Sequence, residues 1–94
     1  GYHGMSDYAL VSLAPKNPGN FPRGSLDSAG IPKSVVDEMV VAAFNDIDMV
    51  RSLIEEQKDE LAGVIVEPFQ RLIPPRPGFL QALREVTAEH GIPL

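Results

Sequence analysis

The sequence contains no cysteine and no tryptophan, and only two of its 94 residues are histidine. Without cysteine the chain can form neither a disulfide framework nor a thiolate metal site. The two histidines, His3 and His90, lie far apart in the sequence, so we expect no metal centre. No apolar run approaches the roughly 20 residues that cross a bilayer, and no signal-peptide pattern opens the chain. We therefore expect a cytoplasmic protein.

Basic residues are also scarce, because 8 Lys and Arg stand against 13 Asp and Glu and give a formal net charge of -5. Binding to nucleic-acid phosphates or to an anionic membrane needs a surplus of positive charge, so we expect neither partner. The remaining composition, 44% hydrophobic and 22% charged, is that of an ordinary globular protein. A chain of this length suffices for one small domain.

Residues 1–43 are predicted to be a loop-rich segment. Proline and glycine recur every few residues between Gly1 and Ile31, and this spacing excludes a long helix. One short strand, Tyr8–Leu13, is expected to interrupt the loop. A loop this long inside a compact domain usually carries function or lies against a partner.

Residues 44–94 are predicted to be a helix-strand-helix segment. Asn45 and Asp46 precede apolar residues at helical spacing, and either side chain can accept hydrogen bonds from the first turn of a helix. The pattern predicts a second helix from about Gly78 to Glu89, which Gly91 ends.

Two short strands are expected around the first helix. The β-branched run Gly63–Val66 is typical of a strand buried on both faces, and Val40–Phe44, before the first helix, is another short candidate. The order strand, helix, strand, helix predicts an α/β fold with a parallel sheet. Because two short strands have little cover, and the chain stops at Ile92–Leu94 where a third strand is due, we expect residues 1–94 to be a fragment of a larger domain.

Two places in the sequence are candidates for binding. Glu67 directly follows the strand predicted before it, and ligands of open α/β sheets bind at the carboxyl ends of strands. The alternative is a solvated glutamate at a strand-to-loop junction. At Tyr2–Gly4 an aromatic ring beside a glycine suits a flat ligand, and the alternative is a loop aromatic that packs on the core.

Six short motifs in a fixed order carry a resemblance to a known family. They are Tyr2–Gly4, Ser28–Val35, Phe44–Asp46, Gly63–Pro68, Ile73–Leu80 and Leu83–Gly91. In this order they closely resemble the middle of the large domain of class III aminotransferases, especially the branch similar to glutamate-1-semialdehyde aminomutase. The resemblance implies a type I aminotransferase fold and the cofactor pyridoxal 5'-phosphate. It also implies a homodimer, and transfer of an amino group between an amine or amino acid and a carbonyl compound, as small-molecule donor and acceptor.

The resemblance assigns five residues to cofactor binding. Tyr2 would stack on one face of the cofactor ring, and His3 and Gly4 would shape the same loop. Glu67 would lie among the polar groups beside the ring, where an anionic neighbour supports a pyridinium. Many members carry a Gly-rich segment with a polar residue shortly after this glutamate. That segment is missing here, so Gln70 is the expected substitute.

No catalytic residue is expected within the chain. The resemblance implies that the phosphate-binding Gly-Thr motif precedes Gly1, and that the ring-nitrogen Asp and the Schiff-base Lys follow Leu94. Lys16, Lys33 and Lys58 match no such position. We therefore expect the isolated chain to be inactive. The alternative is a non-catalytic remnant, or a small α/β module that docks to a partner.

Overall fold

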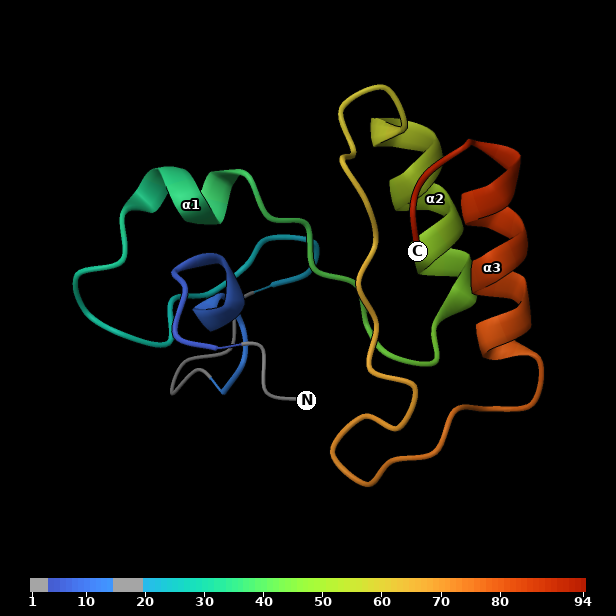
Figure 1. The fold of residues 1–94 in the computed structure, drawn as a ribbon, viewed down its shortest axis with the longest axis horizontal. Coiled ribbons are helices and arrows are strands. Elements are labelled where there is room, and N and C mark those ends of the chain that lie inside the picture. Colours follow the sequence, from blue (N-terminus) through green and yellow to red (C-terminus); the bar gives the residue numbers. More distant parts are fainter. Residues whose placement is uncertain (1–3, 15–19) are drawn as a thin grey trace. The chain divides into compact units, whose positions relative to one another are not determined.

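A computed structural model of the chain describes residues 4–14 and 20–94. Their regular elements are a short 3₁₀ helix at Tyr8–Leu10 and the α-helices α1 (Lys33–Asp37), α2 (Ile47–Gln57) and α3 (Phe79–Glu89) (Figure 1). The described residues divide into two compact units. The N-terminal unit ends at Val41, and the C-terminal unit is Ala42–Leu94.

Helix α2 begins where the sequence predicts a cap. The Asp46 Oδ1 atom accepts a hydrogen bond from the Met49 backbone N–H at 3.0 Å and so satisfies one of the free amides of the first turn. Of the two residues expected at this start, Asp46 is therefore the cap. The predicted helix start is confirmed.

Helix α3 begins after a tight turn and ends at Glu89, and His90 and Gly91 follow it. The Phe79 N–H donates to the Arg76 carbonyl oxygen at 3.0 Å, with Pro77 and Gly78 between them. Gly78 has a φ of 82°, which a type II turn demands at its third residue and glycine adopts without strain. Gly91 has a φ of 67° and leads the chain out of the helix. The predicted second helix is confirmed.

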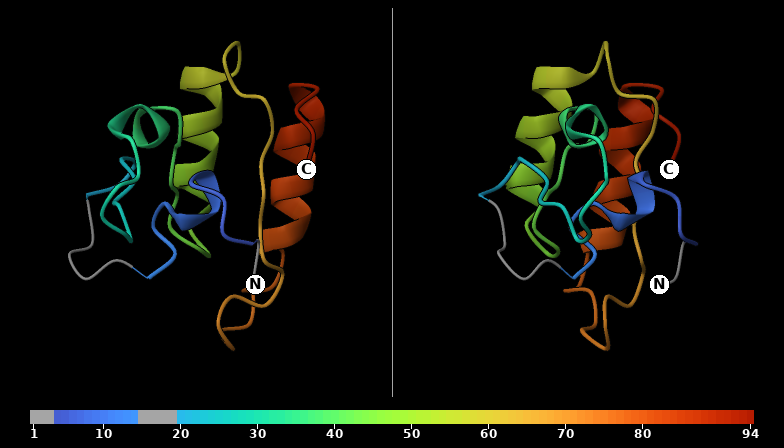
Figure 2. Two further views of the ribbon diagram at one scale, coloured as in Figure 1. Left: turned by 60° about the vertical axis from the view of Figure 1, so that its left-hand side comes forward. Right: turned by 90° about the vertical axis from the view of Figure 1, so that its left-hand side faces the viewer.

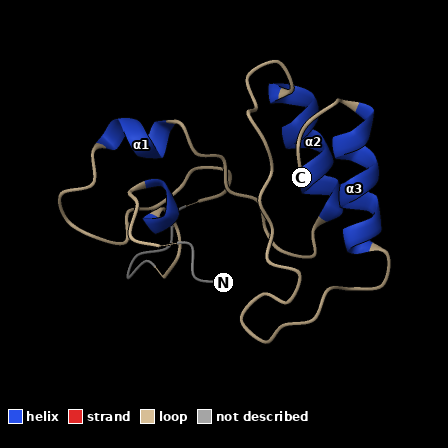
Figure 3. Cartoon of the chain, in the orientation of Figure 1, coloured by secondary structure: helices blue, strands red, loops and turns tan. Residues whose placement is uncertain are grey.

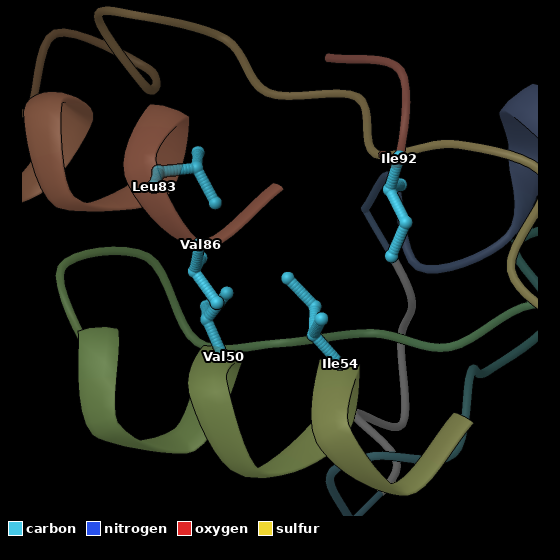
Figure 4. Close-up of a cluster of buried hydrophobic side chains, with 5 residues drawn as sticks. All are labelled: Val50, Ile54, Leu83, Val86 and Ile92. Atoms are coloured by element: carbon cyan, nitrogen blue, oxygen red, sulfur yellow. The ribbon is translucent and has the colours of Figure 1, made fainter. Parts of the chain in front are cut away.

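The two long helices pack side by side (Figure 2). The main core of the C-terminal unit lies between them. Figure 4 shows five buried side chains converging between them: Val50 and Ile54 from α2, Leu83 and Val86 from α3, and Ile92 beyond it. The half-buried Leu61, Val64 and Val66 pack against this cluster. The chain between α2 and α3 is thereby attached to the helix pair.

The predicted parallel sheet is not confirmed. In the described ranges the structure forms no strand, only the isolated bridges Val11–Leu26, Arg23–Val40 and Gln70–Ile73 (Figure 3). A strand is defined by a ladder of hydrogen bonds to a neighbour. Along Gly63–Val66 the Val64 N–H donates to the Pro93 carbonyl oxygen at 2.8 Å, and no ladder develops from this bond. At Val40–Phe44, only Val40 takes part in a bridge.

The N-terminal unit is built around a second, smaller core. Its buried side chains are Val11, Ile31, Val35 and Val36. The predicted strand Tyr8–Leu13 is wrong, because its first three residues form the 3₁₀ helix and only Val11 makes a bridge. Helix α1 was not predicted. Two features of the sequence favour it. Pro32 stands just before its first residue, and Lys33 and Asp37 are spaced by one helical turn, at which distance they form an ion pair.

The phenol of Tyr8 predicts a measurable pH effect. Its O–H donates to Glu38 Oε2 at 2.7 Å, and this bond, with the negative charge of Glu38, raises the pKa of Tyr8. Because the pKa of Tyr8 is raised in the folded unit, the bond stabilises that unit at any pH below the ordinary tyrosine pKa. This stabilisation is lost as the pH rises through the pKa of Tyr8 in the folded unit. We expect Glu38→Gln to lower the Tyr8 pKa, measured by tyrosinate absorbance with Tyr8→Phe to assign the signal. Identical titrations of the wild type and Glu38→Gln would contradict this.

Candidate functional site

Glu67 lies at the end of an extended segment that the C-terminal core holds in place. Val64 and Val66 pack against the buried cluster, whereas Ile65 between them is 72% exposed. Glu67 follows directly and is half-buried. Because the neighbouring valines hold the backbone here, the Glu67 side chain starts from a defined place, from which its carboxylate can reach a cation or a polar ligand group.

Gln70 opens a tight turn with an unusual backbone. The Ile73 N–H donates to the Gln70 carbonyl oxygen at 2.8 Å, and the two residues between them, Arg71 and Leu72, have φ values of 48° and 67°. Positive φ at both central positions is typical of a type I′ turn, which usually takes Asn or Gly. Such strained backbone persists only where the surroundings determine it, and it concentrates at functional sites.

Glu67 and Gln70 both belong to the short segment 67–73, and the structure leaves both residues half-buried. Leu72, at the tip of the turn, is 86% exposed. Carboxylate and amide groups together offer acceptors and a donor to a polar ligand. This segment is the candidate site of the C-terminal unit.

The other predicted site residues belong to the start of the chain. Tyr2 and His3 lie outside the described residues. Gly4 belongs to the N-terminal unit and has a φ of 84°, and apart from its chain neighbours no described residue has an atom within 4 Å of the place where a Cβ would stand. Its glycine is therefore required by backbone conformation and not by a close neighbour.

The described lysines are paired with carboxylates. Lys33 pairs with Asp37, and the Lys58 Nζ atom lies 2.6 Å from Glu55 Oε1. The hydrogen bond to Glu55 and its charge raise the pKa of Lys58. A lysine that attacks a carbonyl must be neutral, so these pairings do not suit a nucleophile. Lys16 lies outside the described residues.

Sequence reasoning missed a role for Asn45. We expected it to help begin a helix, but its side chain hydrogen-bonds to Pro74 and Arg76, directly after the segment 67–73. The signal in the sequence was weak. Asn is one of the few residues that adopt a positive φ readily, and it stands here beside a second residue able to cap the helix.

The described part of the chain offers neither a cluster of metal ligands nor a helix that could span a membrane. No three His, Asp or Glu side chains gather there as metal ligands. Among the same residues, every helix is too short or too polar to span a membrane.

Comparison with known proteins gives clear relatives, although no family model matches the sequence. The chain is 41% identical over 93 residues to a glutamate-1-semialdehyde 2,1-aminomutase of Macrococcus caseolyticus, covering 96% of this chain and 21% of that protein. An enzyme of the same name from an Exiguobacterium species is also 41% identical, with the same coverage. The chain thus spans about a fifth of the length of these relatives.

Solved structures give the same result. An omega-transaminase from Sphaerobacter thermophilus matches with a TM-score of 0.85 and 45% identity, over 97% of this chain and 22% of that one. A structure described as a transaminase with PLP bound matches with a TM-score of 0.79 and 30% identity, over 98% and 22% of the two chains. The resemblance that the six motifs indicate is confirmed.

Proposed function

We propose that this chain, a relative of class III aminotransferases along nearly its whole length, is part of a pyridoxal-phosphate-dependent enzyme. The enzyme would transfer an amino group between an amine or amino acid and a carbonyl compound, or within one molecule as an aminomutase does. The observation that carries the proposal is the identity of 41% to 45% to aminomutases and a transaminase over at least 96% of the chain.

The proposal also covers the domain and the complete enzyme to which the chain would belong. Residues 1–94 would be a fragment of the cofactor-binding large domain of a type I fold, with residues 1–43 as its loop-rich segment. In that domain the extended run Gly63–Val66 would pair through its backbone with neighbouring strands, and the exposed Ile65 side chain would be covered by elements packed on that face of the sheet. We further propose that the enzyme is a cytoplasmic homodimer.

The described residues fit one side of the cofactor. Glu67 offers a half-buried carboxylate and Gln70 a half-buried amide, both in the segment 67–73. These groups suit a charged ring and its polar substituents. The pairing of Lys33 and Lys58 with carboxylates does not suit covalent attachment of the cofactor, so the attaching lysine would come from outside the described residues.

Each residue then has a separate task. When bound, pyridoxal phosphate supplies the carbonyl carbon that receives the amino group and a ring that takes up the released electron pair. The Glu67 carboxylate would stabilise positive charge at the edge of the ring, because opposite charges attract strongly in a partly desolvated site. The Gln70 amide would orient a polar substrate group, and the Tyr2 ring would cover one flat face of the cofactor.

The experiment that tests the proposal compares the complete protein, expressed from its gene, with the 94-residue chain alone. Both are incubated with pyridoxal phosphate, a set of amino donors and a set of carbonyl acceptors. We expect turnover only from the complete protein, and at most weak cofactor binding by the chain alone. Failure of the complete protein to transfer an amino group from any donor would overturn the proposal. A cofactor bound covalently to one lysine of the isolated chain, and reducible by borohydride, would contradict the expected inactivity.

A further inference from the structure

Asn45 connects two parts of the C-terminal unit that are far apart in the sequence. Its Nδ2 atom donates to the Pro74 carbonyl oxygen at 3.1 Å, and its Oδ1 atom accepts from the Arg76 N–H at 2.8 Å. Both partners are backbone groups, 29 and 31 residues away. The Asn45 side chain therefore holds the backbone of Pro74–Arg76 at both of its ends, through one hydrogen bond at Pro74 and one at Arg76.

The backbone at Asn45 is shaped for this role. The Asp46 N–H donates to the Ala43 carbonyl oxygen at 3.3 Å, so Phe44 and Asn45 occupy the centre of a turn that leads into α2. Asn45 has a φ of 68°, which asparagine tolerates better than most residues. Its amide also carries the one acceptor and the donor that the two bonds require. Aspartate would keep the acceptor and lose the donor, and glycine would keep only the backbone freedom.

The segment that Asn45 fixes is the direct continuation of the candidate site. Residues 67–73 carry Glu67 and Gln70 and lead straight into Pro74. Their other end is held by the Val64 hydrogen bond to Pro93 and by the packing of Val66 on the core. A loop fixed at both ends has fewer conformations, so less entropy is lost when its side chains are held in one place.

A ring contact supports the same connection. Phe44, beside Asn45, meets Phe79 at the start of α3 edge to face, with ring centroids 5.2 Å apart. Edge-to-face pairs of this kind are attractive. The turn that contains Asn45 is therefore also in contact with the start of α3, shortly after Arg76.

We propose that Asn45 is a positioning residue, which holds residues 67–73 so that Gln70 and Glu67 meet the cofactor and the substrate. The proposal rests on the proposed aminotransferase function. Asn45 does not itself touch the cofactor in this proposal, and it acts through the backbone of Pro74–Arg76.

The test uses the complete protein and three variants. Asn45→Gly keeps the positive φ and removes both hydrogen bonds, and Asn45→Asp keeps the bond from Arg76 but places an acceptor opposite the Pro74 carbonyl. Asp46→Ala is the matched control, because it removes the α2 cap next door and leaves Asn45 intact. The readouts are kcat and KM separately, the visible absorption of the bound cofactor, thermal stability, and hydrogen exchange at the Arg76 amide.

We expect Asn45→Gly to lower kcat/KM by about 10- to 100-fold, since a displacement of about 1 Å at a reacting group costs up to about 100-fold. Its cofactor absorption should shift and the Arg76 amide should exchange faster. Asn45→Asp should fall between Asn45→Gly and the wild type. Asp46→Ala should lose thermal stability while its kcat/KM and absorption stay at the wild-type values.

Two results would overturn the proposal. One contradicts the positioning role alone, and the other contradicts the proposed function as well. If Asn45→Gly loses stability as Asp46→Ala does but keeps the wild-type kcat/KM and absorption, Asn45 is structural only and the aminotransferase function stands. If Asn45→Gly does not fold, the same comparison is made with Asn45→Asp. If the wild-type complete protein transfers no amino group, the proposed function fails first and the positioning role fails with it.

Discussion

Replacing Leu83 with alanine is expected to remove most of the stability of the C-terminal unit. Leu83 is 2% exposed and stands in the buried cluster with Val50, Ile54, Val86 and Ile92. Truncating a leucine at such a site costs about 2–5 kcal/mol, partly as lost transfer free energy and partly through the cavity left behind. A unit of roughly fifty residues has only about 3–8 kcal/mol of unfolding free energy, so the loss is comparable with the whole.

The measurement is hydrogen exchange resolved along α2 and α3, because it reports this unit separately from the rest of the chain. Leu80→Ala is the matched control, since Leu80 lies on the same helix, is only half-buried and stands outside the cluster. We expect exchange to accelerate through both helices in Leu83→Ala and only slightly in Leu80→Ala. Equal acceleration in the two variants would show that the cluster does not hold the unit together.

The two long helices could be predicted from the sequence because the information that defines them is local. Asp46 supplies a side-chain cap within three residues of its partner, and Gly78 and Gly91 supply the positive φ values at the two ends of α3. The spacing of the apolar residues then selects the faces that meet. Each of these signals depends on neighbours in the sequence, so a single sequence suffices to read them.

The strands could not be predicted in the same way, because a strand depends on a neighbour that its own sequence does not specify. The run Gly63–Val66 has the expected composition, yet among the described residues no ladder forms along it, and the Val64 N–H bonds to the distant Pro93 carbonyl oxygen. At Tyr8 the same reasoning failed for another cause. The hydrogen bond from Val11 N–H to the Tyr8 carbonyl oxygen closes a local turn, and apolar composition alone does not distinguish this from an extended chain.

The candidate site was only partly predictable. Glu67 was predicted from its motif and Gln70 as the substitute for a segment that is missing here, and the structure adds a strained turn at Arg71 and Leu72, directly after Gln70. Asn45 could not be assigned from spacing, because its partners lie about thirty residues away and are backbone groups. Nearly every residue carries the same backbone donor and acceptor, so such partners leave no signature in the sequence.

Replacing Gly24 with alanine is expected to disrupt the core of the N-terminal unit. Gly24 is buried, and a Cβ on its backbone would collide with the Val11 Cγ1 methyl and lie 3.6 Å from Val36 Cγ1 and Val41 Cγ2. Val11 is itself buried and β-branched, so its side chain has few other rotamers to adopt. Overpacking of this kind costs about 1–3 kcal/mol, which is large for a core of four buried side chains.

A double-mutant cycle separates this collision from a general intolerance of alanine. Val11→Ala alone leaves a cavity and should destabilise the unit, but it also removes the methyl that the new Cβ meets. We therefore expect Gly24→Ala to cost little in the Val11→Ala background, measured by hydrogen exchange at the Ser12 and Val41 amides, which bond to Ser25 and Pro22. Gly63→Ala, whose Cβ would lie 3.4 Å from the Pro93 carbonyl oxygen, is the control and should leave these amides unchanged. Additive losses in the double variant would mean that Gly24 is required for its backbone and not for the space beside Val11.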